Sequence, residues 1–288
     1  MFPKTIIMFL CMLIGMSVML HAQSLDGSPY TPGKDPDIDM YFGSWKESMP
    51  YSTHGSLIER DVLTRGDAMK PPRKGAVLEF VNRFTHATLD ARAATTPVKL
   101  EREQEIIYIL GGEGTLNGGG KTYDLHSGIC ALIPASLEFT MKNSGDEPLT
   151  MYLVNEPTPD GFRPNKEILI RDENTMPVEG TTGHWCHIVK NFYETEAGLG
   201  TLERVLTVAF DPMTIGHPHS HGEDVEEVWT QIDDESIAFI GKQIRCQPAG
   251  TGYMIPPDGN TPHANINTGS HRVKMFYFAR YKDHEVRP

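Results

Sequence analysis

The sequence predicts an all-β protein that folds as two small β-barrels in one chain. Short runs rich in β-branched and aromatic residues alternate with Gly, Pro, Asn and Asp, and long segments with helical periodicity are scarce. Several of these runs recur about 122 residues later in the chain. Many short strands with closely spaced turns are typical of a sandwich or barrel, and a duplicated unit predicts two of them.

The internal repeat is defined by anchors that agree on one spacing. Segment 105–110 (EIIYIL) is matched by segment 227–232 (EVWTQI), 122 residues later. Near the end of each copy the offset grows to 124, which predicts two extra residues in the second copy. Agreement among independent anchors indicates a duplication. The remaining anchors are the pairs Gly128 and Gly250, Pro134 and Pro256, and Met151-Tyr152 and Met275-Phe276.

The first residues have the layout of a secretory signal peptide. Lys4 precedes an apolar stretch from residue 5 to residue 20, and His21-Ala22-Gln23 follows it. Sixteen apolar residues are short for a bilayer span, so a retained anchor is disfavoured. We expect cleavage after Ala22, a secreted or periplasmic protein, and no membrane association after cleavage.

The charge and cysteine content of the mature chain exclude two classes of protein. Removal of the signal leaves 288 − 22 = 266 residues. It also removes one lysine from a chain whose net charge is −12, and a chain this acidic is not expected to bind nucleic acid. Cys130, Cys186 and Cys246 allow at most one disulfide. Stability must therefore come from a hydrophobic core rather than a disulfide framework.

The repeat and the composition divide the chain into five expected segments. Residues 23–75 are rich in Pro, Gly, Ser and Asp and are expected to form an extended arm over the first barrel. The full division is a signal peptide at 1–22, the arm at 23–75, a first barrel at 76–158, a connecting segment at 159–199 and a second barrel at 200–288.

The densest cluster of metal-ligating residue types lies at residues 216–227, where three of the twelve histidines fall within five residues. Residues two apart in a strand face the same side, so His219 and His221 are expected to point into the second barrel. Imidazoles at this spacing suit a first-row metal, and a nearby carboxylate would complete the set. An isolated HxH is more often a solvated turn, but the acidic residues and the later pair His263 and Asn267 favour a metal site.

These residues resemble the two signatures of the cupin superfamily. Segment 216–227 looks like the first, with a Gly, an HxH and a Glu; the second is similar to the series Gly250, Pro256, Gly259, His263 and Asn267. The resemblance implies jelly-roll-like barrels, a bicupin, and one divalent transition metal (Mn, Fe, Ni or Zn) on three histidines and one glutamate. The interval between Gly259 and His263 is one residue longer than the common pattern.

Two neighbouring residues compete for the role of the carboxylate ligand. The usual family spacing from His221 selects Glu226, whereas the repeat aligns Glu105 with Glu227. We favour Glu227 narrowly, keep Glu226 as its rival, and regard Glu223 as a third, weaker candidate.

The first copy is expected to lack the metal. The histidine positions near Glu105 hold Lys99 and Glu101, or Pro97 and Lys99, and the later one holds Phe139. We therefore expect a structural, dimerisation or binding module there, which leaves open a homo-oligomer. The scattered His86 and His126 are expected to be ordinary surface or turn residues.

Other polar residues are candidates for contacts with a small-molecule substrate. Gln231 would share the inward face with Glu227, and Tyr277 and Arg280 lie on an expected strand of the second barrel and could clamp a carboxylate, as could Arg245. Equally, Gln231 could be a buried, satisfied amide, and strand Arg and Tyr are more often on a rim. Segment 184–187 (HWCH) has metal-binding residue types but no partner cluster at suitable spacing, so it is not expected to be a metal site.

The predicted function is that of an exported metal-dependent bicupin enzyme. Its substrate would be small and polar, carboxylated or sugar-derived, bound by metal chelation with acid/base or oxidative chemistry; the sequence assigns no catalytic residue. A metal-free first barrel beside a metallated second one is similar to ureidoglycine aminohydrolase-type bicupins, but export fits poorly with an intracellular purine-catabolic role. The alternative is a non-catalytic exported protein that binds a ligand or metal.

Overall fold

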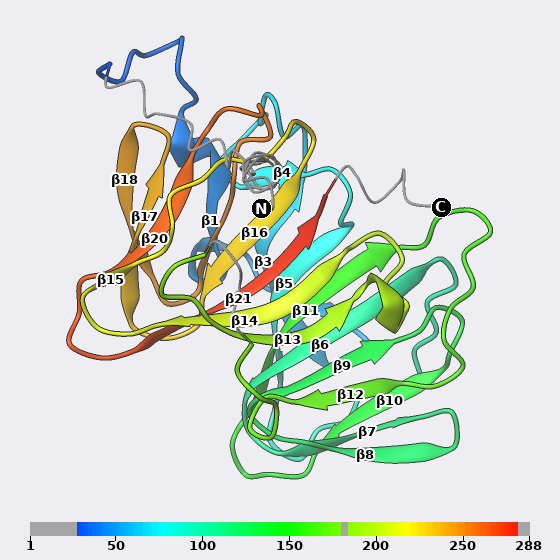
Figure 1. The fold of residues 1–288 in the computed structure, drawn as a ribbon. Coiled ribbons are helices and arrows are strands. Elements are labelled where there is room, and N and C mark those ends of the chain that lie inside the picture. Colours follow the sequence, from blue (N-terminus) through cyan, green and yellow to red (C-terminus); the bar gives the residue numbers. More distant parts are fainter. Residues whose placement is uncertain (1–27, 180–183, 282–288) are drawn as a thin grey trace, which may run out of the picture.

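The computed structural model describes residues 28–179 and 184–281, and the expected signal peptide lies outside these ranges. The described residues form two barrels of antiparallel strands, which confirms the predicted fold class (Figure 1). No helix in these ranges is long and apolar enough to cross a membrane. Cys130, Cys186 and Cys246 are all free in the described structure. The helical elements described are three short 3-10 turns, η1 (Ile38–Tyr41), η2 (Trp45–Glu47) and η3 (Thr195–Ala197).

The first barrel consists of a large sheet that faces a smaller one. The large sheet has the order β12-β9-β6-β11-β5-β3-β2, with β4 beside β3, and the small sheet has the order β10-β7-β8. These strands are β2 (Tyr51–Thr53), β3 (Leu57–Arg65), β4 (Ala76–Leu78), β5 (Arg83–Leu89), β6 (Glu103–Gly111), β7 (Gly114–Gly118), β8 (Lys121–Leu125), β9 (Ile129–Ile133), β10 (Phe139–Asn143), β11 (Leu149–Pro157) and β12 (Leu169–Asp172).

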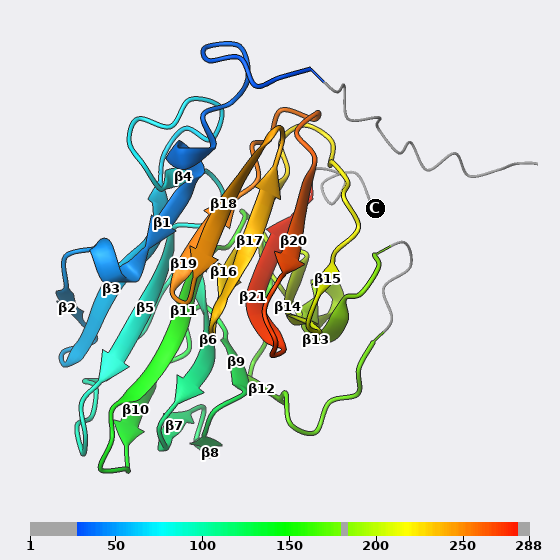
Figure 2. The same cartoon turned by 90° about the vertical axis from the view of Figure 1, so that its left-hand side faces the viewer.

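The second barrel repeats this plan. Its large sheet has the order β1-β19-β16-β21-β14-β13, and its small sheet has the order β15-β20-β17-β18 (Figure 2). These strands are β1 (Phe42–Ser44), β13 (Ile188–Glu194), β14 (Arg204–Phe210), β15 (Thr214–Ile215), β16 (Glu226–Gln231), β17 (Glu235–Ile240), β18 (Gln243–Pro248), β19 (Thr251–Met254), β20 (His263–Asn267) and β21 (Val273–Arg280).

The two repeats exchange their first strands. β1, from the N-terminal arm, pairs with β19 of the second barrel, and β12, from the connecting segment, pairs with β9 of the first. The following strands, β3 and β13, then join the large sheets beside β5 and β14. The arm therefore contacts both barrels, rather than only the first as the sequence suggested, because its strands complete the edges of both large sheets.

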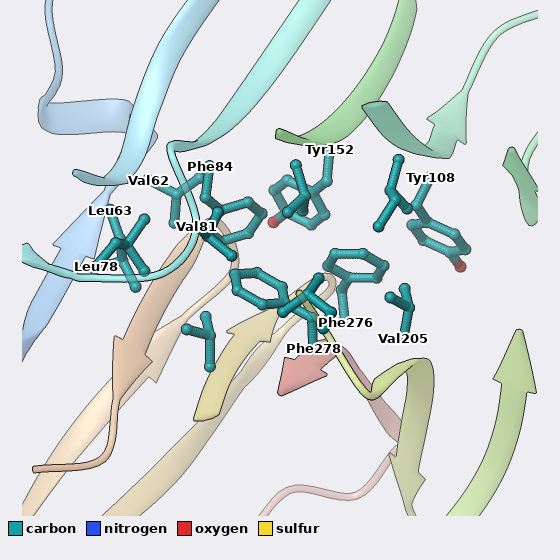
Figure 3. Packing of buried hydrophobic residues seen from close by; sticks show 14 of the residues in the cluster. Val62, Leu63, Leu78, Val81, Phe84, Tyr108, Tyr152, Val205, Phe276 and Phe278 are labelled. Carbon is teal, nitrogen blue, oxygen red and sulfur yellow. The ribbon is translucent and has the colours of Figure 1, made fainter. Parts of the chain in front are cut away.

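A shared apolar core holds the two large sheets face to face. Phe276 stacks on Tyr108 and Tyr152 with ring centroids 5.3 and 5.8 Å apart, and Phe84 meets Phe278 edge-on at 5.0 Å (Figure 3). All five rings are buried. Aromatic pairs at these distances add to the hydrophobic gain of burial, so the barrels are joined by a continuous core.

Strand alternation separates this shared core from the interior of each barrel. On β21, Phe276 and Phe278 face the other barrel, whereas Met275 and Tyr277 pack in the interior of the second barrel. β16 alternates in the same way, because Val228 belongs to the shared core. The face on which each β16 residue lies thus follows from its odd or even position.

The centre of the first barrel contains an imidazole that the sequence analysis did not place there. His54, in the loop before β3, lies with Nε2 3.3 Å from Glu105 Oε2 and Nδ1 3.8 Å from Glu59 Oε1. Arg83 Nε lies 3.5 Å from Glu59 Oε2. Both carboxylates are fully buried, and the His54 side chain is 4% exposed. Two buried carboxylates need nearby positive charge, which His54 and Arg83 can supply.

The sequence analysis matched the histidine positions of the second barrel to residues of the first barrel that are wrong by one position. A bridge pairs His219 with His263, and the matching bridge in the first barrel pairs Val98 with Phe139. The first-barrel counterpart of His219 is therefore Val98, not Pro97 or Lys99. That pair of motif positions holds no imidazole, and the imidazole near Glu105 comes from His54 instead.

We predict that His54→Ala lowers the free energy of unfolding by roughly 3 kcal/mol at pH 6, since it removes one partner of a buried ion pair. Burial lowers the pKa of His54, but its contact with Glu105 and the charges of Glu105 and Glu59 outweigh burial and raise the pKa overall. The stabilisation should be complete below the unfolded-state pKa of about 6.5 and decline as the pH rises through the raised folded-state pKa.

Urea titrations of both proteins from pH 5 to 9 measure this effect. The control is His126→Ala, since His126 is 45% exposed and should contribute less than about 0.5 kcal/mol. A cost of His54→Ala that grows with pH would contradict the assigned ion pair.

Candidate metal centre

Three histidines and one glutamate from separate segments meet inside the second barrel. His219 and His221 lie in the loop between β15 and β16, and His263 begins β20. The backbones of His219 and His263 exchange two hydrogen bonds, of 3.2 and 2.8 Å, which fixes the two segments against each other. Glu227 lies on β16 next to them. The local strand pairing, rather than closeness in sequence, therefore brings the four residues together.

The donor atoms lie at distances that suit one ion. One ring nitrogen each from His219, His221 and His263 lie within 4.8 Å of one another. Glu227 Oε2 is 2.5 Å from His221 Nε2, and Glu227 Oε1 is 3.1 Å from His263 Nε2. Donors about 2.1 Å from a common metal would be about 3.0–3.4 Å apart at octahedral or tetrahedral angles. Modest adjustments would bring this set to that spacing.

The structure places Glu227, and not Glu226, with the histidines. The neighbouring carboxylate of Glu226 points to the opposite face of β16 and accepts hydrogen bonds from the backbone N–H groups of Glu79, Phe80 and Val81, at 2.7 to 3.0 Å. Burial raises the pKa of Glu226 to about 7, although these three donors lower it. Glu223, the third candidate, is exposed.

A contact of the same kind occurs at the other end of the molecule. Glu156 of β11 accepts backbone hydrogen bonds from Gly200, Thr201 and Leu202 at the entrance to β14. Glu226 and Glu156 therefore each fasten one barrel to the chain that enters the other. This gives Glu226 a structural role that is independent of any metal.

Glu227 and His219 have the protonation states that a metal ion requires. Burial raises the pKa of Glu227, but the charge interactions and contacts with His221 and His263 outweigh it and hold that pKa well below its usual range. Burial lowers the pKa of His221, but Glu227 outweighs burial and raises that pKa overall. Burial and nearby His263 lower the pKa of His219 to about 3, so His219 is neutral. A metal requires deprotonated carboxylate and neutral imidazole donors.

Several buried polar atoms of the cluster have no hydrogen-bond partner among the described residues. They are His221 Nε2, Glu227 Oε2 and both ring nitrogens of His263; the first two contact each other at 2.5 Å and His263 Nε2 contacts Glu227 Oε1 at 3.1 Å, but none of these contacts has hydrogen-bond geometry. Such atoms are costly in a protein interior unless an ion or water satisfies them. The donor set and its orphaned atoms thus fit a bound cation.

The pocket beside the cluster contains residues that sequence reasoning set aside. His184 and His187 line it, together with His219, His221, Glu227 and Tyr277. His184 Nε2 is 3.2 Å from His219 Nε2. The HWCH segment was not expected to meet a ligand cluster because its partners lie more than thirty residues away, but the exchange of strands before β13 returns it to the barrel mouth.

The four candidate substrate contacts lie in different places. Tyr277 lines the pocket, and its hydroxyl contacts that of Tyr281. Gln231 is a buried amide that donates to the carbonyl of Asp233 and accepts from Ser236. Arg280 packs its guanidinium 3.6 Å from the centre of the Phe80 ring, on the face of β16 and β21 that points away from the pocket. Arg245 pairs with Asp39 at an exposed position. Only Tyr277 of these four is therefore positioned to touch a ligand.

Comparison with known proteins agrees with this architecture. The profile of the family described as "Cupin domain" matches residues 85–155, which form most of the first barrel. No curated protein sequence matches the chain significantly. The sequence match thus falls on the barrel that lacks the histidine cluster.

Solved structures resemble the chain along most of its length. A variant of oxalate decarboxylase from Bacillus subtilis has a TM-score of 0.63 at 12% identity, with 86% of this chain and 78% of that chain covered. The protein Ylba from E. coli has a TM-score of 0.57 at 14% identity, covering 81% and 94%. AerE from Microcystis aeruginosa has a TM-score of 0.58 at 13% identity, covering 84% and 100%. The family match identifies a cupin domain in the first barrel, and these likenesses, with a second barrel built on the same strand order, show that the chain has a bicupin-like fold.

Proposed function

We propose that this chain is an exported metal-dependent bicupin enzyme that acts on a small polar substrate, carboxylated or sugar-derived. The observation that carries the proposal is the inward convergence of His219, His221, Glu227 and His263, with unpartnered donor atoms. These four residues would hold one divalent ion, Mn, Fe, Ni or Zn. When bound, such an ion polarises a substrate oxygen and lowers the pKa of bound water.

The charge and size of the pocket favour a small anion. Glu227 supplies one negative charge, so the pocket would carry a net positive charge with a divalent ion in place. Arg204 also lines the pocket, but its charge is paired with Glu194, 3.5 Å away. The cavity has a volume of about 50 Å³, which is room for a few water molecules. Of the two substrate classes, these features favour the carboxylated one.

Solved relatives are consistent with this chemistry. The similar solved structures include oxalate decarboxylase, an enzyme of a small dicarboxylate, and one of them concerns the Mn(II) centres of that enzyme. At 11–12% identity these likenesses support a divalent metal and a small acid in this chain only as a proposal.

The residues around the cluster would orient the substrate and the carboxylate. Trp229 Nε1 donates to Glu227 Oε1 at 2.6 Å, which fixes the carboxylate and leaves Oε2 directed to His221. Burial raises the pKa of both Tyr277 and Tyr281, so both hydroxyls stay protonated; because one donates to the other, the second proton of the pair is available to a substrate oxygen. Trp229, Tyr277 and Tyr281 line the pocket with aromatic rings, whose low local dielectric strengthens these polar contacts.

We predict that Glu227→Gln, like His219→Ala and His263→Ala, loses most of the metal that the purified protein retains after dialysis. Glu226→Gln is the matched control. It should keep its metal but lose roughly 2 kcal/mol of stability, because it weakens hydrogen bonds to a charged group. Elemental analysis and urea unfolding measure the two effects. Greater metal loss in Glu226→Gln than in Glu227→Gln would assign the ligand to the other face of β16.

We predict turnover of a small carboxylate or sugar acid once Mn²⁺, Fe²⁺, Ni²⁺ or Zn²⁺ is restored to the purified protein. His219→Ala should lower kcat/KM by at least about 100-fold, since loss of even an outer-shell partner costs 10- to 100-fold. Product analysis by mass spectrometry over a substrate panel is the measurement. Ligand binding without conversion under every metal would instead support a non-catalytic exported binding protein.

We predict that export removes residues 1–22. Mass spectrometry of the protein recovered from the periplasm or medium should find a mature N-terminus at Gln23, because the stretch before it has the layout of a cleaved signal. Recovery of the chain only from the cytosol, with residues 1–22 intact, would overturn the proposed localisation and leave the metal centre unaffected.

A further inference from the structure

We infer that His184 is an additional ligand of the metal centre, so that four imidazoles and Glu227 hold the ion. His184 lies in the segment that leads into β13, outside both motif segments of the second barrel. The inference rests on the metal centre proposed above and deepens it.

The distance between His184 and His219 is that of two neighbouring ligands of one ion. Their Nε2 atoms are 3.2 Å apart. Two nitrogens that are each about 2.1 Å from a metal lie about 3.0–3.4 Å apart at angles of 90–109°. The rings meet edge to face, with centroids 4.6 Å apart, so the two nitrogens approach without stacking of the rings.

The tautomer of His219 determines whether its Nε2 faces His184 as a hydrogen-bond donor or as an acceptor. His219 Nδ1 is 2.8 Å from the backbone carbonyl of His217, which can only accept, so Nδ1 carries the proton. Nε2 of His219 therefore presents a lone pair. A metal ion that binds this lone pair takes away the hydrogen-bond acceptor that His184 Nε2 faces. Because His184 Nε2 lies next to the same lone pair, it is placed to bind that ion itself.

The first barrel contains an imidazole at the equivalent position, which is an independent argument. His54 lies four residues before Ile58 of β3, just as His184 lies four residues before Ile188 of β13, and His54 reaches Glu105, the counterpart of Glu227, at 3.3 Å. The equivalence follows from strand register. In the first barrel, Ile58 pairs with Thr88, which pairs with Thr150. In the second barrel, Ile188 pairs with Ala209, which pairs with Lys274. Thr150 and Lys274 are 124 residues apart, which is the repeat offset at this end of the copies, so Ile58 and Ile188 are equivalent.

The other histidines near the cluster are placed differently. The ring of His187 packs edge-on against Phe210 and Trp229, at centroid distances of 5.0 and 5.8 Å. His217 contributes its backbone carbonyl to His219, and its ring lies against Trp185. His187 therefore provides a control that removes an imidazole from the same pocket.

A fifth protein ligand would change how the substrate binds. Five protein donors leave one open position on a six-coordinate ion, whereas four donors leave two. Attachment of the substrate through a single oxygen is then favoured over two-point chelation. The sequence predicted that the metal chelates the substrate, and a fifth protein ligand would limit that contact to one substrate oxygen.

The test uses Co²⁺ as the probe, loaded into the full-length mature protein and into His184→Ala, His187→Ala and His263→Ala. X-ray absorption counts the imidazoles on the ion, and competition with a chromophoric chelator measures affinity. We expect four imidazoles in wild type and His187→Ala but three in His184→Ala. We also expect Co²⁺ affinity at least about tenfold weaker in His184→Ala, because even outer-shell partners contribute this much.

The outcomes separate this inference from the metal centre itself. Three imidazoles in both wild type and His184→Ala would overturn the inference, as would equal losses of affinity in His184→Ala and His187→Ala. Unchanged Co²⁺ binding in His263→Ala would instead overturn the proposed centre. If His184→Ala fails to fold, His184→Gln keeps a polar side chain without an imidazole and should show the same loss of one ligand.

Discussion

The compensation of a buried carboxylate is the constraint on which both barrels depend. Glu227 and Glu105 occupy matching positions of the repeat, and both are almost completely removed from water. An isolated carboxylate there would cost far more than the protein's net stability, so each must be balanced by charge or hydrogen bonds. The first barrel balances its two carboxylates with His54 and Arg83. The second instead places His221 and His263 against its carboxylate and His219 beside them, which is the donor set of a cation site.

The site is coupled to the rest of the fold through the pleat of one strand. Glu227 and Trp229 of β16 face the pocket, while Glu226 and Val228 face the first barrel. The same strand therefore carries the site on one side and the barrel interface on the other. The neighbouring strand β21 is supported on the side of the first barrel, because its Phe276 packs against Tyr108 and Tyr152. The first barrel in this way acts as a rigid support for the chemistry of the second.

Sequence reasoning reached the features that depend on local pattern or on the repeat. Alternation of short strands predicted the fold class, and the repeat pointed to Glu227 over the rival Glu226. It did not reach contacts created by the exchange of strands. His54 precedes Glu105 by 51 residues and His184 precedes Glu227 by 43, so the repeat offset does not reveal their equivalence. The arm was assigned to one barrel for the same reason, and the face of Arg280 depended on a register that only the paired strands define.

The most direct test of this account is an anomalous difference map from crystals of the metal-loaded protein, recorded at the absorption edge of the added ion. We predict one peak per chain, enclosed by His219, His221, Glu227 and His263, and no peak beside His54 and Glu105. A peak in the first barrel, or none in the second at full metal loading, would contradict the claim that the two barrels balance the same buried charge in different ways.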